Sequence, residues 1–65
     1  MNEKIRSLQK NGEYRFEGLT REESKKAAEE LARAAMRYDR KYGIRCKYGI
    51  ARDAFGYYYA VTMQD

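Results

Sequence analysis

Hydrophobic and polar positions alternate near the start of the chain, which predicts a β-hairpin. Residues 5–10 and 13–19 flank the dipeptide Asn11-Gly12, the strongest short-range signal for a two-residue type I′ turn. With these two residues as the loop, oppositely charged side chains fall opposite each other across the strands. The inward face of this predicted hairpin carries Ile5, Ser7, Gln9, Tyr14 and Phe16.

The middle of the chain has the spacing of a long amphipathic helix from Thr20 to Tyr42. Thr20 followed by Glu23 forms a capping box at the helix start, and Gly43 is expected to end the helix. One side of the helix, which should face a sheet, carries Ala27, Ala28, Leu31, Ala34, Ala35, Tyr38 and Tyr42.

Two further strands are expected after the helix. Residues 44–50 alternate apolar with polar or small side chains, residues 52–56 form a turn, and residues 57–63 form the last strand. In the last strand the odd positions are the more apolar set, so we expect them to face inward. Cys46 is in step with the apolar residues of its strand, which favours a buried core position over a reactive thiol.

The predicted order of elements is therefore β-β-α-β-β. We expect an α+β fold in which one helix packs on a four-stranded antiparallel sheet, forming a two-layer sandwich. Residues 1–65 are interpreted as a single small domain. One helix covers only one face of such a sheet, so the other face is expected to be open to solvent or to a partner.

The charge balance favours an acidic partner. Fourteen Lys and Arg against ten Asp and Glu give a net charge of +4, which suits nucleic acid, an acidic protein surface or a ribonucleoprotein that carries both. No apolar run is long enough to cross a bilayer and no signal-peptide core opens the chain, so no membrane partner is expected. The lone cysteine fits a reducing, cytoplasmic setting.

The residues needed for catalysis are missing from the sequence. The chain has no histidine, and its two serines therefore lack the usual general base. One cysteine without histidine does not make a zinc site, and no glycine-rich phosphate loop is present. We therefore expect neither an enzyme nor a cofactor or metal. Asp39 and Asp53 are too isolated to form a catalytic pair, and Asp53 is interpreted as a turn residue.

Two basic features are candidate binding surfaces. One is a stripe of cations along the outer side of the helix, and the other is the open face of the sheet, where cations surround an aromatic ring. Such a surface suits stacked bases with their phosphates, and it suits a protein interface equally well. The predicted partner-binding residues are Arg33, Arg37 and Arg40 on the helix and Arg15, Arg45, Lys47 and Tyr58 on the sheet.

The β-β-α-β-β order, the capped helix from Thr20, the Tyr57-Tyr58-Tyr59 strand and the missing catalytic set together resemble, in layout, small phage or mobile-element inhibitors of the anti-CRISPR type. That resemblance implies a compact protein without catalytic residues that blocks a site on a host complex. The first hypothesis is therefore a non-enzymatic protein-binding module, an inhibitor of a nucleic-acid-handling complex.

Two other functions stay open. The second hypothesis is a small basic nucleic-acid-binding domain that uses the same residues, for which affinity should fall steeply as salt rises. The third is a structural or dimerisation module, in which an edge strand such as residues 57–63 pairs with its copy. The regular cap, turn and charge placement would also suit a designed miniprotein.

Overall fold

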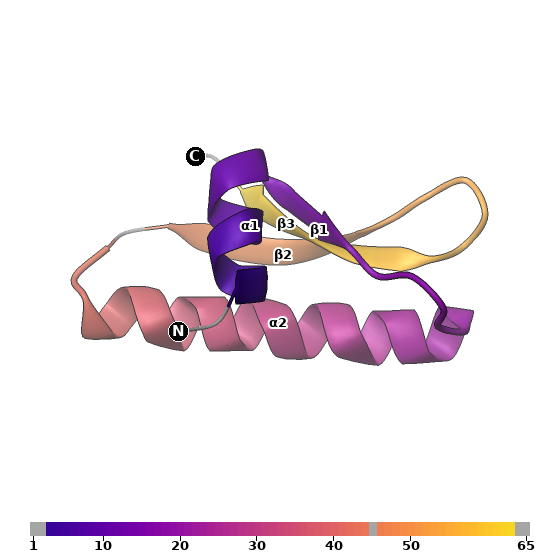
Figure 1. Cartoon of the computed structure of the whole chain (residues 1–65), viewed down its shortest axis with the longest axis horizontal. Coiled ribbons are helices and arrows are strands. Elements are labelled where there is room, and N and C mark those ends of the chain that lie inside the picture. Colours follow the sequence, from indigo (N-terminus) through magenta and orange to yellow (C-terminus); the bar gives the residue numbers. More distant parts are fainter. Residues whose placement is uncertain (1–2, 45, 64–65) are drawn as a thin grey trace.

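The computed structural model describes residues 3–44 and 46–63, and these contain two helices and a three-stranded antiparallel sheet (Figure 1). Both helices contribute to one hydrophobic core, since Leu8 and Leu31 pack in the same cluster as Ala60 of the sheet. The strand order in the sheet is β1-β3-β2. The elements are α1 (Glu3–Asn11), β1 (Glu13–Arg15), α2 (Arg21–Lys41), β2 (Lys47–Arg52) and β3 (Tyr58–Met63).

The α+β class is confirmed, but the predicted four-stranded sheet is wrong. The segment expected as the first strand forms α1, in which Ile5 and Leu8 lie on one side of the helix, three residues apart, and are 5% and 0% exposed. As a strand the segment would have turned Ser7 and Gln9 inward beside Ile5. Helical spacing buries only the two apolar side chains, and most other residues of α1 favour a helix.

Asn11-Gly12 reverses the chain after a helix and not within a hairpin. Gly12 has φ +81°, a conformation that costs glycine no steric strain, and its N–H donates to the Leu8 carbonyl at 2.8 Å. Its own carbonyl accepts from Thr62 N–H at 2.9 Å. The chain therefore passes from α1 directly into β1, which pairs with β3 for three residues with Tyr14 opposite Ala60. The rest of the predicted strand 13–19 connects β1 to α2.

The predicted long helix is confirmed at both ends. The Thr20 hydroxyl accepts from Glu23 N–H at 3.1 Å, and the Glu23 carboxylate accepts from Thr20 N–H at 2.9 Å. This capping box lowers the pKa of Glu23, chiefly through the hydrogen bond from the Thr20 backbone. At the other end Gly43 has φ +72°, with Gly43 N–H bonded to the Arg40 carbonyl and Ile44 N–H to the Asp39 carbonyl. These two bonds form a Schellman motif.

β2 and β3 form a hairpin whose side-chain orientation differs in part from the prediction. Tyr48 and Ala60 face the helices, being 7% and 0% exposed, while Cys46 precedes β2 and is exposed. The expectation that Cys46 lies in the core is therefore wrong. In β3 the even positions and not the odd ones face inward. The alanine-rich side of α2 can approach the sheet closely over Ala60, whereas Tyr59 and Val61 are left on the open face.

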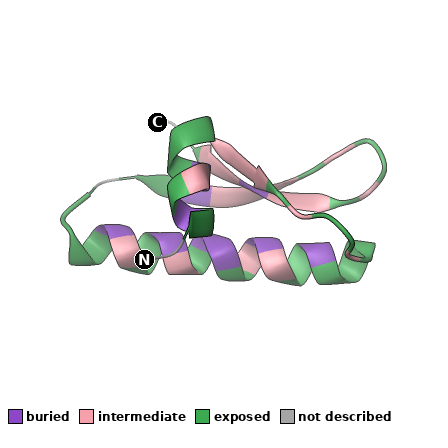
Figure 2. Cartoon of the chain, in the orientation of Figure 1, coloured by how far each residue is buried: buried purple, intermediate pink, exposed green. Residues whose placement is uncertain are grey.

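A buried carboxylate connects three elements of the core. Asp39 of α2 is 2% exposed and accepts hydrogen bonds from Tyr48 Oη of β2 at 2.5 Å and from Gln9 Nε2 of α1 at 2.7 Å. Burial, followed by the hydrogen bond to Asp39, raises the pKa of Tyr48 well above its ordinary value. The burial view of the chain shows the buried positions along the side of α2 that faces the sheet (Figure 2).

We predict that Gly43→Ala lowers the free energy of unfolding by about 1–2 kcal/mol, because an L side chain is strained in the left-handed region. Chemical denaturation of the two chains measures the difference. A synthetic chain with D-alanine at position 43 is the matched control, since it adds the same methyl group and prefers positive φ. Equal destabilisation by both alanines would contradict the conformational explanation.

We also predict that the free energy of unfolding decreases as the pH rises above about 10, the ordinary pKa of tyrosine. Unfolded Tyr48 loses its proton there while folded Tyr48, whose pKa is raised, keeps it. High pH therefore favours the unfolded chain, and below that pH this contribution is constant. Urea denaturation across a pH series should show a shallower decrease for Tyr48→Phe, and the same decrease in both chains would refute the assignment.

Candidate functional site

The charges of this protein are unevenly distributed along its chain. Residues 31–52 contain seven of the fourteen Lys and Arg but only one of the ten Asp and Glu, namely Asp39. Asp39 is buried in the core and hydrogen-bonded there. Residues 31–52 therefore place cations on the surface but no carboxylate. The remainder of the chain has slightly more acidic than basic residues.

The second half of α2 and the turn after it expose most of these cations. The same stretch of chain exposes apolar side chains, with Met36 42%, Tyr42 59% and Ile44 47% exposed. The Schellman turn holds Ile44 against the end of the helix through its bond to the Asp39 carbonyl. We call this surface the cationic patch, and it consists of Arg33, Met36, Arg37, Arg40, Lys41, Tyr42 and Ile44.

The side chains of the cationic patch make weak contacts among the residues that the structure describes. Arg33 Nη2 lies 3.7 Å from Glu29 Oε2 one helical turn earlier, and the two side chains are 66% and 38% exposed, so this ion pair is weak. Lys41 Nζ lies 5.8 Å from the centre of the Tyr42 ring, which itself packs on Tyr38 at 4.8 Å. The patch thus combines cations with a supported aromatic ring.

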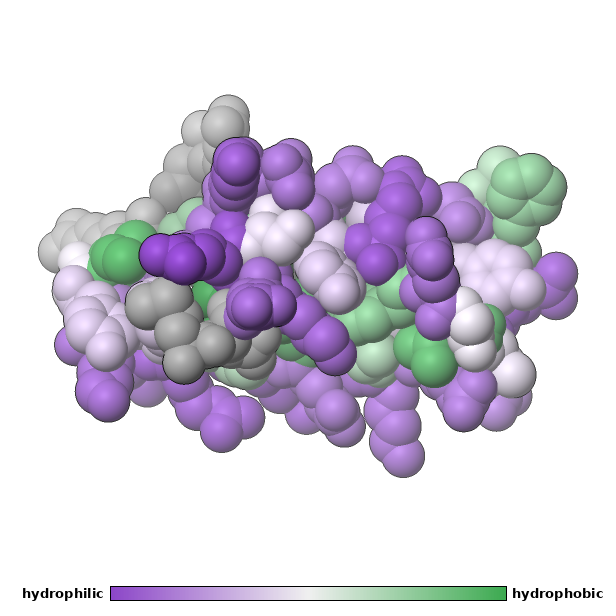
Figure 3. Space-filling view, viewed as in Figure 1, coloured by the Kyte–Doolittle hydropathy of each residue, from purple (hydrophilic) through white to green (hydrophobic). Residues whose placement is uncertain are grey.

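Figure 3 shows one face of the molecule, on which hydrophobic side chains occur in separate places between hydrophilic ones.

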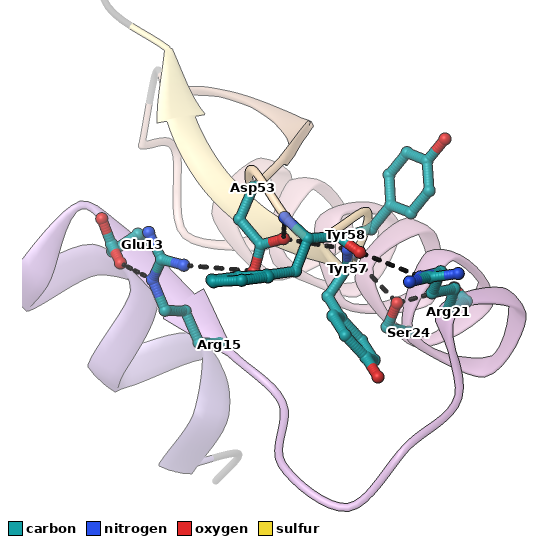
Figure 4. Close-up of polar contacts among 8 residues, drawn as sticks. Glu13, Arg15, Arg21, Ser24, Asp53, Tyr57 and Tyr58 are labelled. Atoms are coloured by element: carbon teal, nitrogen blue, oxygen red, sulfur yellow. Dashed lines mark hydrogen bonds and ion pairs between the residues drawn. The ribbon is translucent and has the colours of Figure 1, made fainter.

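Arg15 lies on the open face of the sheet as predicted, but its charge is already neutralised. Its Nε lies 2.6 Å from Glu13 Oε2 and its Nη1 lies 3.9 Å from Asp53 Oδ2 (Figure 4). Its guanidinium also lies 4.0 Å from the centre of the Tyr59 ring. The hydrogen bond with Glu13 is the main cause of its raised pKa. Arg15 is therefore a weak candidate for binding an anion from solution.

Tyr58 does not lie on the open face. It sits opposite Arg52 on the helix-covered side, its N–H donates to Ser24 Oγ at 3.0 Å, and Lys25 Nζ lies 5.8 Å from its ring. The ring lines a shallow hollow between the start of α2 and the hairpin turn, together with Arg21, Lys25 and Arg52. The alternation that we assigned to β3 was wrong by one residue, which explains the misplacement.

Asp53 is confirmed as the residue that organises the hairpin turn. Its Oδ1 accepts from Phe55 N–H at 2.9 Å and from Tyr57 N–H at 3.0 Å. Its backbone N–H donates to the Tyr57 carbonyl at 2.9 Å. This is the side-chain mimicry of a turn for which aspartate is favoured, so the carboxylate is occupied with structure.

The predicted binding residues do not form one surface. Arg33, Arg37 and Arg40 share the exposed side of α2, whereas Arg15 and Tyr58 lie on opposite faces of the sheet. Lys47 begins β2 on the open face, and Arg45 lies outside the described residues.

The sequence reasoning missed Met36, Lys41, Tyr42 and Ile44 as members of the patch. The sequence contains a signal for this surface, namely the spacing of Asp39, the only acid of residues 31–52. Asp39 lies four residues after Ala35 and eight after Leu31, which places it on the buried side of the helix. The exposed side of residues 31–52 is therefore left without an acid.

No family model matches this chain, and neither a curated protein nor a solved structure resembles it significantly. Within residues 3–44 and 46–63, no three metal-ligating side chains of His, Cys, Asp or Glu gather, and no helix is long and apolar enough to span a membrane. A function for this chain therefore rests on its own geometry and charge.

Proposed function

We propose that this protein is a non-enzymatic binding module that docks on an acidic surface of a partner protein through the cationic patch. The observation that carries the proposal is the inward orientation of Asp39, which leaves the cations of the second half of α2 without a carboxylate of their own segment. Cations arranged in this way attract an anionic surface and accelerate its association.

The exposed apolar side chains favour a protein partner over nucleic acid. Met36 and Ile44 are 42% and 47% exposed, and aliphatic groups gain nothing from phosphates. Methionine, tyrosine and arginine are enriched at protein interfaces, where an apolar centre is surrounded by a charged rim. In the cationic patch, Met36, Tyr42 and Ile44 would supply the apolar contacts and the arginines the electrostatic complementarity.

An inhibitory role is part of the proposal. A small domain that covers an acidic site on a larger complex prevents the natural ligand of that site from binding. Nucleic-acid-handling complexes carry acidic sites of this kind where carboxylates hold metal ions. An inhibitor of such a complex, similar to those of the anti-CRISPR type, would act by occupation alone and would need no catalytic residue.

Nucleic-acid binding is the second candidate function. Arg33, Arg37 and Arg40 recur once per helical turn, a spacing that allows successive arginines to contact neighbouring phosphates. Such binding is dominated by counterion release, so the affinity falls steeply with salt and does not depend on Met36 or Ile44.

We predict that Arg37→Glu/Arg40→Glu weakens binding to an acidic Glu-Tyr copolymer about tenfold or more, because like charges then meet at the interface. The matched control is Arg6→Glu/Lys26→Glu, which changes the net charge equally at exposed positions outside the patch. Fluorescence anisotropy at several salt concentrations measures both. Equal losses in the two variants would show an effect of net charge alone and would contradict the proposal.

A further pair of measurements separates the two candidate functions. Met36→Ser/Ile44→Ser should reduce affinity for the copolymer at least about tenfold, since burial of one apolar side chain contributes about 1.5–3 kcal/mol. The affinity for short oligonucleotides should be unchanged. Tighter binding of oligonucleotides than of the copolymer, with a steep salt dependence, would place nucleic-acid binding first.

A further inference from the structure

β2 is an edge strand with a regular backbone. Among the described residues it has one neighbouring strand, β3, and all six of its residues are in register with that neighbour, from Lys47 opposite Met63 to Arg52 opposite Tyr58. The other edge of the sheet is the shorter β1, of three residues. An edge of this length and regularity is a template for a further strand.

The backbone hydrogen bonds of β3 identify which peptide groups of β2 face outward. Thr62 N–H of β3 donates to Gly12, on the β1 side, so Thr62 turns its peptide groups away from β2. Its partner in β2 is Tyr48. In an antiparallel ladder such a pair alternates with hydrogen-bonded pairs, so the N–H and C=O groups of Tyr48, Ile50 and Arg52 point to the outer edge. Ile50 lies at the centre of this row.

The charges along β2 favour an acidic segment at this edge. The strand begins with Lys47 on the open face and ends with Arg52 on the helix-covered face, and it contains no carboxylate. Arg52 also lines the shallow hollow that contains Arg21 and Lys25. Asp53, the nearest acid after the strand, is occupied by the turn. A strand placed beside β2 therefore meets cations at both ends.

The same charges disfavour a second copy of the chain at this edge. Pairing two β2 strands would place four cations, two copies each of Lys47 and Arg52, along one pair of strands that contains no carboxylate. Cations gathered in this way repel one another, and terminal cations are a common protection of sheet edges against self-association. The occupant that fits is a different, acidic polypeptide.

We propose that β2 binds an extended acidic segment of the partner protein as a fourth strand of the sheet. This inference rests on the proposed function and specifies its mode. Backbone hydrogen bonds to Tyr48, Ile50 and Arg52 provide the pairing, while acidic side chains at the two ends of the segment meet Lys47 on one face and Arg52 on the other. This mode of recognition obtains affinity from the main chain and specificity from the flanking charges.

The test uses a labelled peptide of about nine residues, the length of a long strand, with alternating Val and Thr in the middle and two Glu at each end. Hydrogen exchange followed by NMR reports on individual amides. On saturation, the Ile50 amide should exchange at least about tenfold more slowly, since it becomes hydrogen-bonded. The same peptide with Lys in place of Glu is the charge control and should bind about tenfold more weakly or not at all.

Two variants locate the binding. A synthetic chain with N-methyl-isoleucine at position 50 keeps the side chain and removes only the outward donor, so it should bind the acidic peptide at least about tenfold more weakly. Lys47→Glu/Arg52→Glu should weaken binding by a similar factor, whereas Arg6→Glu/Lys26→Glu should have little effect. Circular dichroism confirms that each chain is folded.

The outcomes distinguish this inference from the proposed function. Peptide binding that shifts resonances of the cationic patch, with Ile50 exchange unchanged, would overturn the β2 proposal and leave the docking surface on α2 in place. Slower Ile50 exchange with full affinity in Arg37→Glu/Arg40→Glu would support β2 and overturn the patch on α2. Concentration-dependent dimers that protect Ile50 without peptide would show a second copy at this edge, and the proposal would be wrong.

Discussion

The buried carboxylate of Asp39 is the interaction on which both the fold and the surface of this protein depend. It accepts hydrogen bonds from Tyr48 of β2 and Gln9 of α1, so a single side chain of α2 holds the N-terminal helix and an edge strand in place. A buried charge is tolerated only when its hydrogen bonds are satisfied, and the two donors must therefore reach it together. The same geometry removes the only acid of residues 31–52 from the surface.

The proposed binding surfaces follow from that arrangement. Once Asp39 is turned inward, the outer side of α2 after Arg33 exposes cations and apolar side chains, and β2 presents an edge with a cation at each end. The two surfaces come from one continuous stretch of chain, joined by the turn at Gly43. Acids elsewhere are used differently, since Glu13 neutralises Arg15, Glu23 caps α2 and Asp53 shapes the hairpin turn.

The N-terminal segment shows why local pattern alone predicted the wrong element. Residues 5–10 are compatible with both an alternating strand and a helix, because only Ile5 and Leu8 are apolar. Asn11-Gly12 suits both readings as well, since a glycine with positive φ serves a type I′ turn and a helix C-terminus equally. The helix is favoured because it places both Ile5 and Leu8 in the core cluster that contains Leu31. A strand over the same residues would not bury these two side chains alone.

The sequence by itself determined the elements whose signals are local. The capping box at Thr20, the glycine stop at Gly43 and the aspartate turn at Asp53 each depend on hydrogen bonds between residues close in the chain, and each is present as predicted. Only the tertiary structure decided which face of β3 lies inward and where Cys46 and Tyr58 point, and only it brought Asp39 to its partners on α1 and β2. Those features depend on how closely an alanine-rich helix approaches Ala60 and on contacts between residues far apart in sequence, and local periodicity contains no information about either.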